Sequence, residues 1–510
     1  MGGWPARARG CLGSTRMMGA SPARRVALDI LLDLEDSGAY ARDALDASLK
    51  VRALDRRDAG LAMRLVLGVV ASYGCLDDLI DAFSDKPDRM NSRVRNALRI
   101  ATFELIYLGT EPRAAVSQGV ELVRDRARSA TGFANAVLRR IAECRDSYLD
   151  ADDVREQGAR GRFAASIVSL ARRGGLPEWL TERIVDSIGF DSAEDLAAAE
   201  FEPAPVAVQV NPHDSDAEED LRRIVRGAGN AREGFGEPLA NGITVQEGQL
   251  PGAVLDVPSA RLVGTDLLKR SGVAVCDLNA QVIATAALAE GRCLEVGSGR
   301  GTKTFVMTAQ AQRLGIACSS VALELSRRKT SLNRRRLERA GLAEGVRFAT
   351  GDGCDLDQSL RDIDGEAEGR ALFASVLVDA PCSGTGTMRR HPEIPWRLLP
   401  VDVDEDLPEL QLALLTEAAG RVVPGGQLLY ATCSILKEEN ASVVNAFLAS
   451  PAGAAFSLEP VSNAPAFRMD VCEGAADYVR AHEDGRGRFQ TVPKPDGFDG
   501  HFCARMVRRG

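Results

Sequence analysis

Aromatic residues are scarce in this chain and long apolar runs are missing. Phe, Trp and Tyr make up 5% of the residues, and no stretch approaches the roughly 20 consecutive apolar residues that a membrane-spanning helix needs. The opening "MGGWPARARGCLGSTRMMGASPARR" is basic but has none of the apolar core of a secretory signal. We therefore expect no membrane association, and we expect residues 1–20 to form a disordered tail.

The chain also lacks any C-x-x-C pair. Its 11 cysteines are odd in number and scattered along the sequence. This pattern argues against a disulfide framework and against a structural zinc site. Most of the cysteines are expected to be small buried residues in a reducing cytoplasm. We expect a cytoplasmic protein without a bound metal, and a monomer, although the sequence leaves the oligomeric state open.

Charge of neither sign dominates the whole chain. The net charge is −9 over 510 residues, a length that predicts two or three domains. Residues 1–150 contain 23 Lys+Arg against 20 Asp+Glu, a balance of +3, and the remainder carries −12. A negative total does not exclude RNA binding, because local basic patches determine where RNA binds.

The first third of the chain has helical periodicity. The segment "RRVALDILLDLEDSG" places Val26, Ile30 and Leu31 on one helix face. Similar patterns continue to about residue 145 and predict an all-α domain over 21–145. From periodicity alone, a plain helical bundle with a solvated charged face is the simpler interpretation. Residues 146–270 are expected to form a linking region with one helix in "LPEWLTERIVDSIG" and one strand in "PVAVQVNP".

From about residue 271 to 510 strands and helices alternate, which predicts a parallel sheet with crossover helices, the Rossmann-like α/β class. The segment "DLDQSLRDIDGEAEGR" is expected to be an exposed insertion. Ligands of such sheets bind beyond the carboxyl ends of the strands. The candidate strands cover residues 292–296, 320–324, 346–350, 374–379 and 426–432.

A glycine-rich loop, "LEVGSGRGTKT", follows the first of these strands. A P-loop for nucleoside triphosphates requires glycine where Thr302 stands, and the dinucleotide pattern G-x-G-x-x-G fails at the same position. A third candidate ligand is S-adenosylmethionine, whose methionine end approaches backbone amides closely and so favours glycine. Glu324 ends the second strand, where a carboxylate would accept from ribose hydroxyls, and Asp352 follows the third, near an adenine edge. Exposed acids are also common at strand ends, so these features favour the methyl donor without proving it.

Two cysteines follow the fourth and fifth strands, in "VDAPCSGTGTMRRHPEIPWR" and "LLYATCSILKEEN". Cys382 and Cys433 are therefore expected at the carboxyl ends of adjacent strands, over one site. Methylation of pyrimidine carbon 5 suits this arrangement, because a thiolate that adds to carbon 6 makes carbon 5 nucleophilic. Asp379 is placed to stabilise that adduct near ring nitrogen 3. Lys303 is expected to lower the thiol pKa.

These two motifs closely resemble those of the RsmB/Sun (Fmu) family of ribosomal RNA cytosine-5 methyltransferases. The resemblance extends over most of the chain: "AAVSQGVELVRDRA" and "GFANAVLRR" look like the NusB-like RNA-binding domain of that family, and "VCDLNAQ" and "DGFDGHFCARM" look like segments of its catalytic domain. It implies an all-α NusB-like domain followed by a Rossmann-like methyltransferase domain.

The resemblance also implies roles for individual residues. Cys433 would be the nucleophile, and Cys382 would help to release the methylated product, with Asp379 and Lys303 as further catalytic groups. The residues that would contact S-adenosylmethionine are Gly297, Ser298, Gly299, Arg300, Gly301, Thr302, Lys303, Glu324, Asp352 and Asp379.

The loop departs from the family pattern, which usually reads like "DxCAAPGGKT". Glu295 replaces aspartate, Arg300 stands where proline is usual, and Thr302 replaces the second glycine. These changes bear on cofactor geometry and affinity. Gln209 also stands where the family tends to place arginine, which removes one expected RNA contact.

Basic residues indicate where RNA would bind. The segment "RRKTSLNRRRLERA" is either an RNA contact or an arginine-rich solvated helix. Arg389 and Arg390 adjoin the expected site, and we predict that both contact the RNA backbone. The target base must be unpaired or flipped out of a duplex.

The sequence therefore predicts an S-adenosylmethionine-dependent enzyme that forms 5-methylcytosine in small-subunit (16S) ribosomal RNA through a covalent cysteine–cytosine intermediate. One alternative is the same chemistry on transfer RNA, against which the NusB-like segment argues. Another is an inactive RNA-binding or assembly factor, against which Cys382, Cys433, Asp379 and Lys303 argue together. A P-loop ATPase would need a glycine at position 302.

Overall fold

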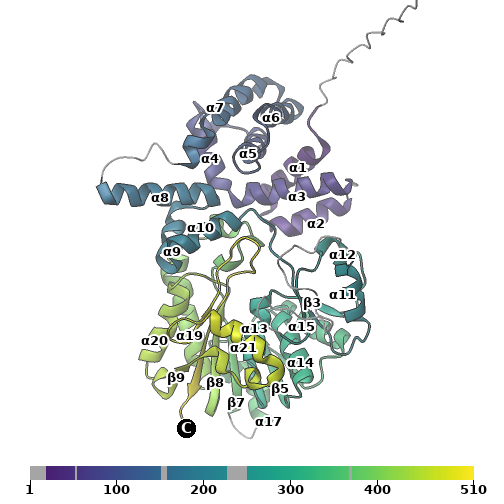
Figure 1. Cartoon of the computed structure of the whole chain (residues 1–510), viewed down its shortest axis with the longest axis vertical. Coiled ribbons are helices and arrows are strands. Elements are labelled where there is room, and N and C mark those ends of the chain that lie inside the picture. The colour runs from purple at the N-terminus through teal and green to yellow at the C-terminus, as the bar shows by residue number, and fades with distance from the viewer. Residues whose placement is uncertain (1–18, 52–53, 151–157, 227–249, 367–369) are drawn as a thin grey trace, which may run out of the picture. The chain divides into compact units, whose positions relative to one another are not determined.

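A computed structural model describes residues 19–51, 54–150, 158–226, 250–366 and 370–510 (Figure 1). The expected tail, apart from residues 19 and 20, lies outside the described residues. Contacts between residues divide the chain into two compact units, Met1–Asp153 and Val154–Gly510. The finer domain boundaries expected from the sequence stay predictions.

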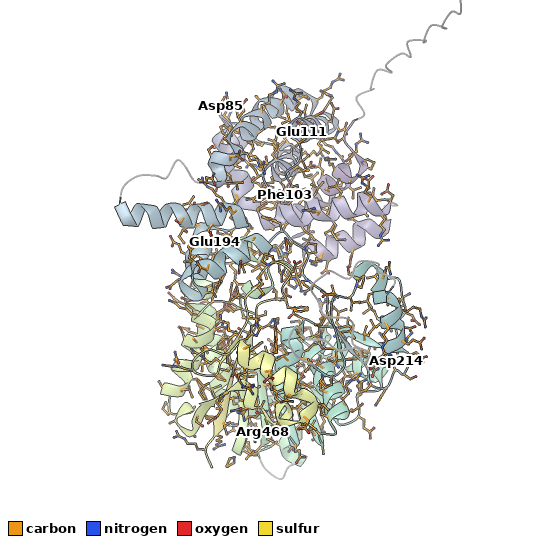
Figure 2. All side chains as sticks on the ribbon, in the orientation of Figure 1. Asp85, Phe103, Glu111, Glu194, Asp214 and Arg468 are labelled. Atoms are coloured by element: carbon orange, nitrogen blue, oxygen red, sulfur yellow. The ribbon has the colours of Figure 1, made fainter. Side chains whose placement is uncertain are left out.

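The first unit is all-α, as predicted. Helix α1 has Pro22 in its first turn and ends at Gly38, whose left-handed backbone lets its N–H donate to the Leu34 carbonyl. Helix α5 is buried along nearly all of its length, and Phe103 within it (Figure 2) is 1% exposed. The helices are α1 (Pro22–Ser37), α2 (Ala41–Val51), α3 (Arg56–Ala71), α4 (Tyr73–Ala82), α5 (Ser92–Ile106), α6 (Pro112–Arg126) and α7 (Thr131–Leu149).

Within the described residues, no single helix is long and apolar enough to cross a membrane. Helices α3 and α4 pass that test only when taken together, across a bend of 78°. Both helices contribute buried residues to the first unit, so their apolar composition is that of core helices.

The second unit begins with a helical layer and a small sheet. The expected helix in "LPEWLTERIVDSIG" is α9 and the expected strand in "PVAVQVNP" is β1, so both predictions are confirmed. The small sheet has the order β2-β1-β3, with antiparallel pairing. The elements are α8 (Gly158–Gly174), α9 (Glu178–Ile188), α10 (Phe190–Ala199), β1 (Val208–Val210), α11 (Ala217–Arg226), β2 (Ala253–Val254), α12 (Ser259–Leu262) and β3 (Val273–Val275).

The main sheet has eight strands in the order β10-β11-β8-β7-β4-β5-β6, with β9 paired to β11. The five strands predicted from the sequence are β4 to β8, and their mutual pairing is parallel, as expected. β11 pairs antiparallel with β8 and so closes one side of the parallel block. The strands are β4 (Gly291–Val296), β5 (Cys318–Glu324), β6 (Val346–Thr350), β7 (Phe373–Asp379), β8 (Val422–Thr432), β9 (Phe456–Glu459), β10 (Phe489–Gln490) and β11 (Phe502–Arg508).

Helices cover both faces of this sheet, because side chains alternate in direction along each strand. On one face, Cys293 of β4 packs with α13, α14 and α21; on the other, Leu294 packs with α19 and α20. Helix α15 joins the α14 side through Leu337, which packs with Phe305. The helices are α13 (Leu278–Ala286), α14 (Thr302–Leu314), α15 (Arg327–Ala340), α16 (Leu356–Ser359), α17 (Arg361–Glu366), α18 (Ile394–Arg397), α19 (Leu407–Ala419), α20 (Val443–Ala449) and α21 (Glu473–Ala481).

The expected exposed insertion over 355–370 is only partly exposed: most of its described charged residues lie on the surface, but it also has a buried face. Leu356, Leu360 and Ile363 are buried against the sheet, at the spacing of a helical face. Asp364 pairs with Arg421, whose side chain is fully buried. The high charge of this segment suggests an exposed loop. It does not reveal that every third or fourth residue is apolar or that one of its acids pairs with a buried guanidinium. Residues 367–369 lie outside the described part.

Candidate active site

The functional residues meet at the carboxyl edge of the parallel block. The last residues of neighbouring strands are in register: Val296 of β4 pairs with Leu323 of β5 and with Val378 of β7, and Asp379 pairs with Ala431 of β8. The loops after these strands therefore lie side by side. This confirms that the strands preceding Cys382 and Cys433 are adjacent.

The glycine loop connects β4 to α14 and needs glycine for two physical reasons. Gly297 and Gly301 have φ of 86° and 81°, in the left-handed region. A Cβ at Gly297 would lie 2.3 Å from the carbonyl oxygen of Asp379, and one at Gly301 would lie 1.9 Å from Oδ1 of Asn333. Neither position tolerates a side chain without moving its neighbour.

Glu324 fixes the loop from the end of β5. Its Oε2 accepts from the Gly299 N–H at 2.9 Å, and its Oε1 accepts from the Ser326 N–H at 2.9 Å. The residue is 7% exposed, so the carboxylate is a rigid acceptor beside the loop. Asp352 lies beyond β6 on the same edge, is exposed, and accepts from the Cys354 N–H at 2.9 Å.

The loop also contains buried acceptor atoms that suit a ligand with donor groups. Among the described residues, neither Glu295 Oε1 nor Ser298 Oγ has a hydrogen-bond partner. Burial raises the pKa of Glu295 to about 7, while the Thr304 hydroxyl, which donates to its other oxygen at 2.6 Å, opposes that rise. Unpaired buried acceptors are costly unless a donor satisfies them. An ammonium group at this loop fits them, as does the methionine end of S-adenosylmethionine.

Thr302, the residue that breaks both phosphate-loop patterns, starts α14. Its hydroxyl accepts from the Arg336 guanidinium at 2.9 Å. Arg300 is exposed at the tip of the loop. Where a phosphate-binding loop would have glycine at the start of the helix, this loop has Thr302, which is hydrogen-bonded to Arg336 of α15.

Lys303 reaches from α14 to the end of β7. Its Nζ donates to both carboxylate oxygens of Asp379, each at 2.8 Å. Burial would lower the pKa of Lys303, but the Asp379 carboxylate outweighs burial and raises it. Lys303 is therefore a permanent positive charge at the site.

The two cysteines of the paired motifs are in direct contact. Their Sγ atoms lie 3.3 Å apart, and both residues are half-buried. The hydrogen bond between the two sulfurs lowers the pKa of Cys433. Burial opposes this shift, and the charge of Lys303 supports it. The same hydrogen bond raises the pKa of Cys382. The contact therefore favours a thiolate at Cys433 over a thiolate at Cys382.

A buried carboxylate joins the two cysteine loops, and the sequence interpretation missed it. Glu439 is 0% exposed and accepts from the Ser383 N–H at 2.8 Å, from the Ser434 hydroxyl at 2.7 Å and from Gln411 Nε2 at 3.0 Å. Ser383 and Ser434 each follow a cysteine directly. The available signal was an acid six residues after Cys433, in the same stretch as the cysteine motif "TCSILKEEN".

The prediction that Arg389 and Arg390 contact RNA stays a prediction, but both side chains have partners within the fold. The Arg389 side chain is 1% exposed and donates to the Gly497 carbonyl at 2.8 Å. Arg390 pairs with Asp499 and with Asp277 (3.4 Å). Both guanidiniums hold the segment before β11 in place. Arg389 is buried there, and Arg390 pairs with two carboxylates while 24% of its side chain stays exposed.

The sequence also raises expectations for Gln209, the remaining cysteines and possible metal ligands, and the structure shows their surroundings. Gln209 is fully buried and donates to the Pro251 carbonyl at 3.2 Å, so this position is a packing position here. The ten cysteines in the described ranges are all free. No group of three or more His, Cys, Asp or Glu residues that could hold a metal ion occurs in those ranges.

Comparison with known proteins gives the same two parts. A family model described as 16S rRNA methyltransferase RsmB/F matches residues 283–507, and one described as the NusB family matches residues 21–143. The chain is 31% identical over 498 residues to the ribosomal RNA small subunit methyltransferase B of Thermus thermophilus, covering 96% of this chain and 99% of that relative.

Two further similarities cover nearly the whole length. The chain is 27% identical over 503 residues to a probable ribosomal RNA small subunit methyltransferase B of Bacillus subtilis, covering 97% of this chain and 100% of that protein. The crystal structure of PH0851 superposes with a TM-score of 0.67 at 19% identity, covering 96% of this chain and 100% of that one. The latter similarity shows a shared fold.

Proposed function

The chain belongs to the 16S rRNA methyltransferase RsmB/F family, and on that basis we propose that it transfers a methyl group from S-adenosylmethionine to carbon 5 of a cytosine in small-subunit ribosomal RNA. Methylation of ribosomal RNA is supported by the names of its relatives. The choice of cytosine carbon 5 is supported by one observation above all, the contact between Cys382 and Cys433.

In this proposal Cys433 is the nucleophile. Its thiolate forms a bond to carbon 6 of the cytosine, and the electron pair of the ring double bond moves to carbon 5. S-adenosylmethionine, when bound, supplies an activated methyl group to that carbon. Removal of the carbon 5 proton then returns the electron pair to the ring, and the bond between sulfur and carbon 6 breaks. Cys433 leaves as the thiolate with which it began.

Cys382 serves the last stage. Its thiol, whose pKa is raised by the hydrogen bond to Cys433, keeps its proton while Cys433 is a free thiolate. Once Cys433 is bonded to the cytosine, that hydrogen bond is lost, the pKa of Cys382 falls, and the Cys382 proton passes to solvent. The Cys382 thiolate then accepts the carbon 5 proton, and both cysteines return to their starting states. The neighbouring thiols thus divide addition and elimination between them.

Asp379 and Lys303 act as a pair at the pyrimidine. Addition of sulfur to carbon 6 builds negative charge that ring nitrogen 3 shares, and this charge needs a nearby donor or cation. Lys303 holds both oxygens of Asp379. We assign Lys303 to the electrostatic stabilisation of the charge at ring nitrogen 3 and of the Cys433 thiolate, and Asp379 to the ring edge, where its carboxylate holds the Lys303 ammonium beside the cytosine.

The cofactor would be held by the loop and by the strand-end acids. The unpaired acceptors of Glu295 and Ser298 fit its ammonium group, and Glu324 is a fixed acceptor for ribose hydroxyls. Asp352 supplies a further carboxylate at the next strand end. The residues that we assign to the cofactor are Gly297, Ser298, Gly299, Arg300, Gly301, Thr302, Lys303, Glu324, Asp352 and Asp379.

Bisulfite sequencing tests this function. The purified protein is incubated with S-adenosylmethionine and 16S ribosomal RNA transcribed in vitro, with a transfer RNA pool as the parallel substrate. We expect protection of a cytosine in the ribosomal RNA only. Protection in the transfer RNA alone would move the substrate to that class, and methylation of another base or atom would overturn the cytosine-5 chemistry.

A further inference from the structure

Helix α15 carries a row of arginines that the chemistry at the cysteines does not use. At 100° per residue, Arg328, Arg335 and Arg339 fall within about 40° of one another on the helix surface. We call these three residues the α15 stripe. All three are exposed, and the stripe points away from the buried side of the helix, which contains Thr330, Asn333 and Leu337.

The stripe is not neutralised by the protein. None of its three arginines forms an ion pair with a carboxylate in the described part of the chain, although the exposed Glu338 lies on the same helix. A surface helix that exists only to be solvated usually mixes charges of both signs. Here the outward row carries one sign, in a chain whose net charge is −9.

Further cations crowd the side of α15 that faces the glycine loop. Arg336 donates to the Thr302 hydroxyl at the start of α14. Burial lowers the pKa of Arg336, and the like charges of Arg300 and Arg339 lower it further. Repulsion among these guanidiniums costs stability, so an anion that bridges them is favoured.

The position of the stripe relates it to the active site. Helix α15 begins at Arg327, three residues after Glu324, the last residue of β5 at its carboxyl end. Cys433 follows β8, and the strand order places β8 three strands from β5. At a spacing of about 4.8 Å between strands, the carboxyl ends of β5 and β8 are about 14 Å apart. From Arg328 to Arg339 the stripe runs roughly 16 Å further along α15, away from that edge. An RNA segment of several nucleotides is long enough to reach from Cys433 along the stripe.

We propose that the α15 stripe, together with Arg300, binds the phosphate backbone of the RNA next to the target cytosine. This inference rests on the proposed function. Arginine suits the role because its planar guanidinium binds phosphate through two hydrogen bonds. Contacts of this kind position the RNA without reading its sequence. Arg300, where relatives of this family usually place proline, extends the same positive surface onto the cofactor loop.

The test compares two variants that lose the same charge. The stripe variant is Arg328→Gln/Arg335→Gln/Arg339→Gln. The control variant removes three exposed arginines that are already paired with carboxylates of their own helices, Arg222→Gln/Arg223→Gln/Arg480→Gln. RNA affinity is measured against salt concentration with 16S ribosomal RNA transcribed in vitro, and affinity for S-adenosylmethionine by calorimetry.

The stripe variant should lose about three units of the slope of log affinity against log salt, because each lost phosphate contact removes about one. KM for RNA should rise roughly tenfold or more, with kcat and cofactor affinity unchanged. The control variant should match the wild type. A third variant, Arg328→Lys/Arg335→Lys/Arg339→Lys, keeps the charge and should retain most of the slope.

Equal slopes and equal KM for the stripe and control variants would overturn the proposal while leaving the methyltransferase intact. A wild-type protein that neither binds nor methylates the RNA would instead refute the proposed function itself. A stripe variant that loses cofactor binding would show that these arginines support the fold of the loop rather than the RNA.

Discussion

The Sγ atoms of Cys382 and Cys433 lie 3.3 Å apart, at the ends of two adjacent parallel strands. A hydrogen bond between the two sulfurs lowers the pKa of Cys433 and raises that of Cys382, so Cys433 ionises first. A second described pair, Cys293 of β4 and Cys318 of β5, also shares a hydrogen bond, but Cys318 lies at the amino end of its strand, away from the carboxyl edge. The contact between Cys382 and Cys433 gives each sulfur a separate chemical task.

Removal of the nucleophile should stop the reaction. Cys433→Ala is expected to lower kcat by at least about 10³-fold, because the covalent route is lost. The fold and the affinity for S-adenosylmethionine should stay the same. Methyl transfer from labelled cofactor to 16S ribosomal RNA measures kcat. Circular dichroism checks the fold, and calorimetry measures the affinity for S-adenosylmethionine. Normal turnover would remove Cys433 from its role.

Removal of the second thiol should trap the intermediate instead. Cys382→Ala retains the nucleophile but lacks the group that we assign to the carbon 5 proton, so protein and RNA should stay joined. The adduct appears as a band of reduced mobility on a denaturing gel. The matched control is Cys382→Ala/Cys433→Ala, which should give no such band. Free product release by the single variant would contradict the assignment.

The pH dependence of the reaction should report on Cys433. The Cys382 thiol lowers the pKa of Cys433, with support from Lys303. The thiolate fraction grows with pH, so kcat/KM should rise as the pH passes the pKa of Cys433. Lys303→Met removes the cation, and the rising limb should move to higher pH. A limb that stays in place would show that Lys303 does not act on the thiol.

The buried carboxylate of Glu439 should matter to both stability and rate. Glu439→Gln keeps the size of the side chain but replaces a charged acceptor that has several donors. We expect a loss of about 1–3 kcal/mol in the free energy of unfolding, and a lower kcat because Ser383 and Ser434 no longer hold the cysteine loops. The neighbouring Glu438→Gln, at a half-buried position, is the control for denaturant unfolding and for kcat. Equal behaviour of the two variants would leave Glu439 without a positioning role.

Glu324 should contribute to cofactor affinity. Glu324→Ala removes an acceptor beside the glycine loop and releases the Gly299 N–H that it holds. We expect the dissociation constant for S-adenosylmethionine to rise by about tenfold or more, the value of one charge-assisted hydrogen bond. Calorimetric titration measures it, with ATP as a ligand that should not bind either form. Unchanged affinity would count against the assignment of Glu324.

The sequence predicted most of the frame of this site, because the frame depends on local patterns. Alternating apolar residues located β4 to β8, and each expected residue at a strand end lies at the carboxyl edge of the sheet. Parallel strands with crossover helices place their ends together, so the neighbourhood of Cys382 and Cys433 followed from topology.

What the sequence did not predict depends on partners far away in the chain. Arg389 and Arg390 look like RNA contacts until the fold brings Asp277 and Asp499 to them. Glu439 looks like a surface acid until Ser383 and Gln411 surround it. In each case the sequence suggests a solvent-exposed charge, but the fold pairs it with groups that are distant in the chain. No local sequence pattern indicates such a pairing.

The most direct test of the account is to identify the sulfur that bonds to the RNA. The wild-type protein is incubated with S-adenosylmethionine and 16S ribosomal RNA that contains 5-fluorocytidine, whose fluorine blocks the final elimination. After nuclease and protease digestion, mass spectrometry locates the attached nucleotide. The account predicts that the nucleotide is bonded to Cys433. Attachment to Cys382, or no attachment while the same protein methylates ordinary RNA, would contradict it.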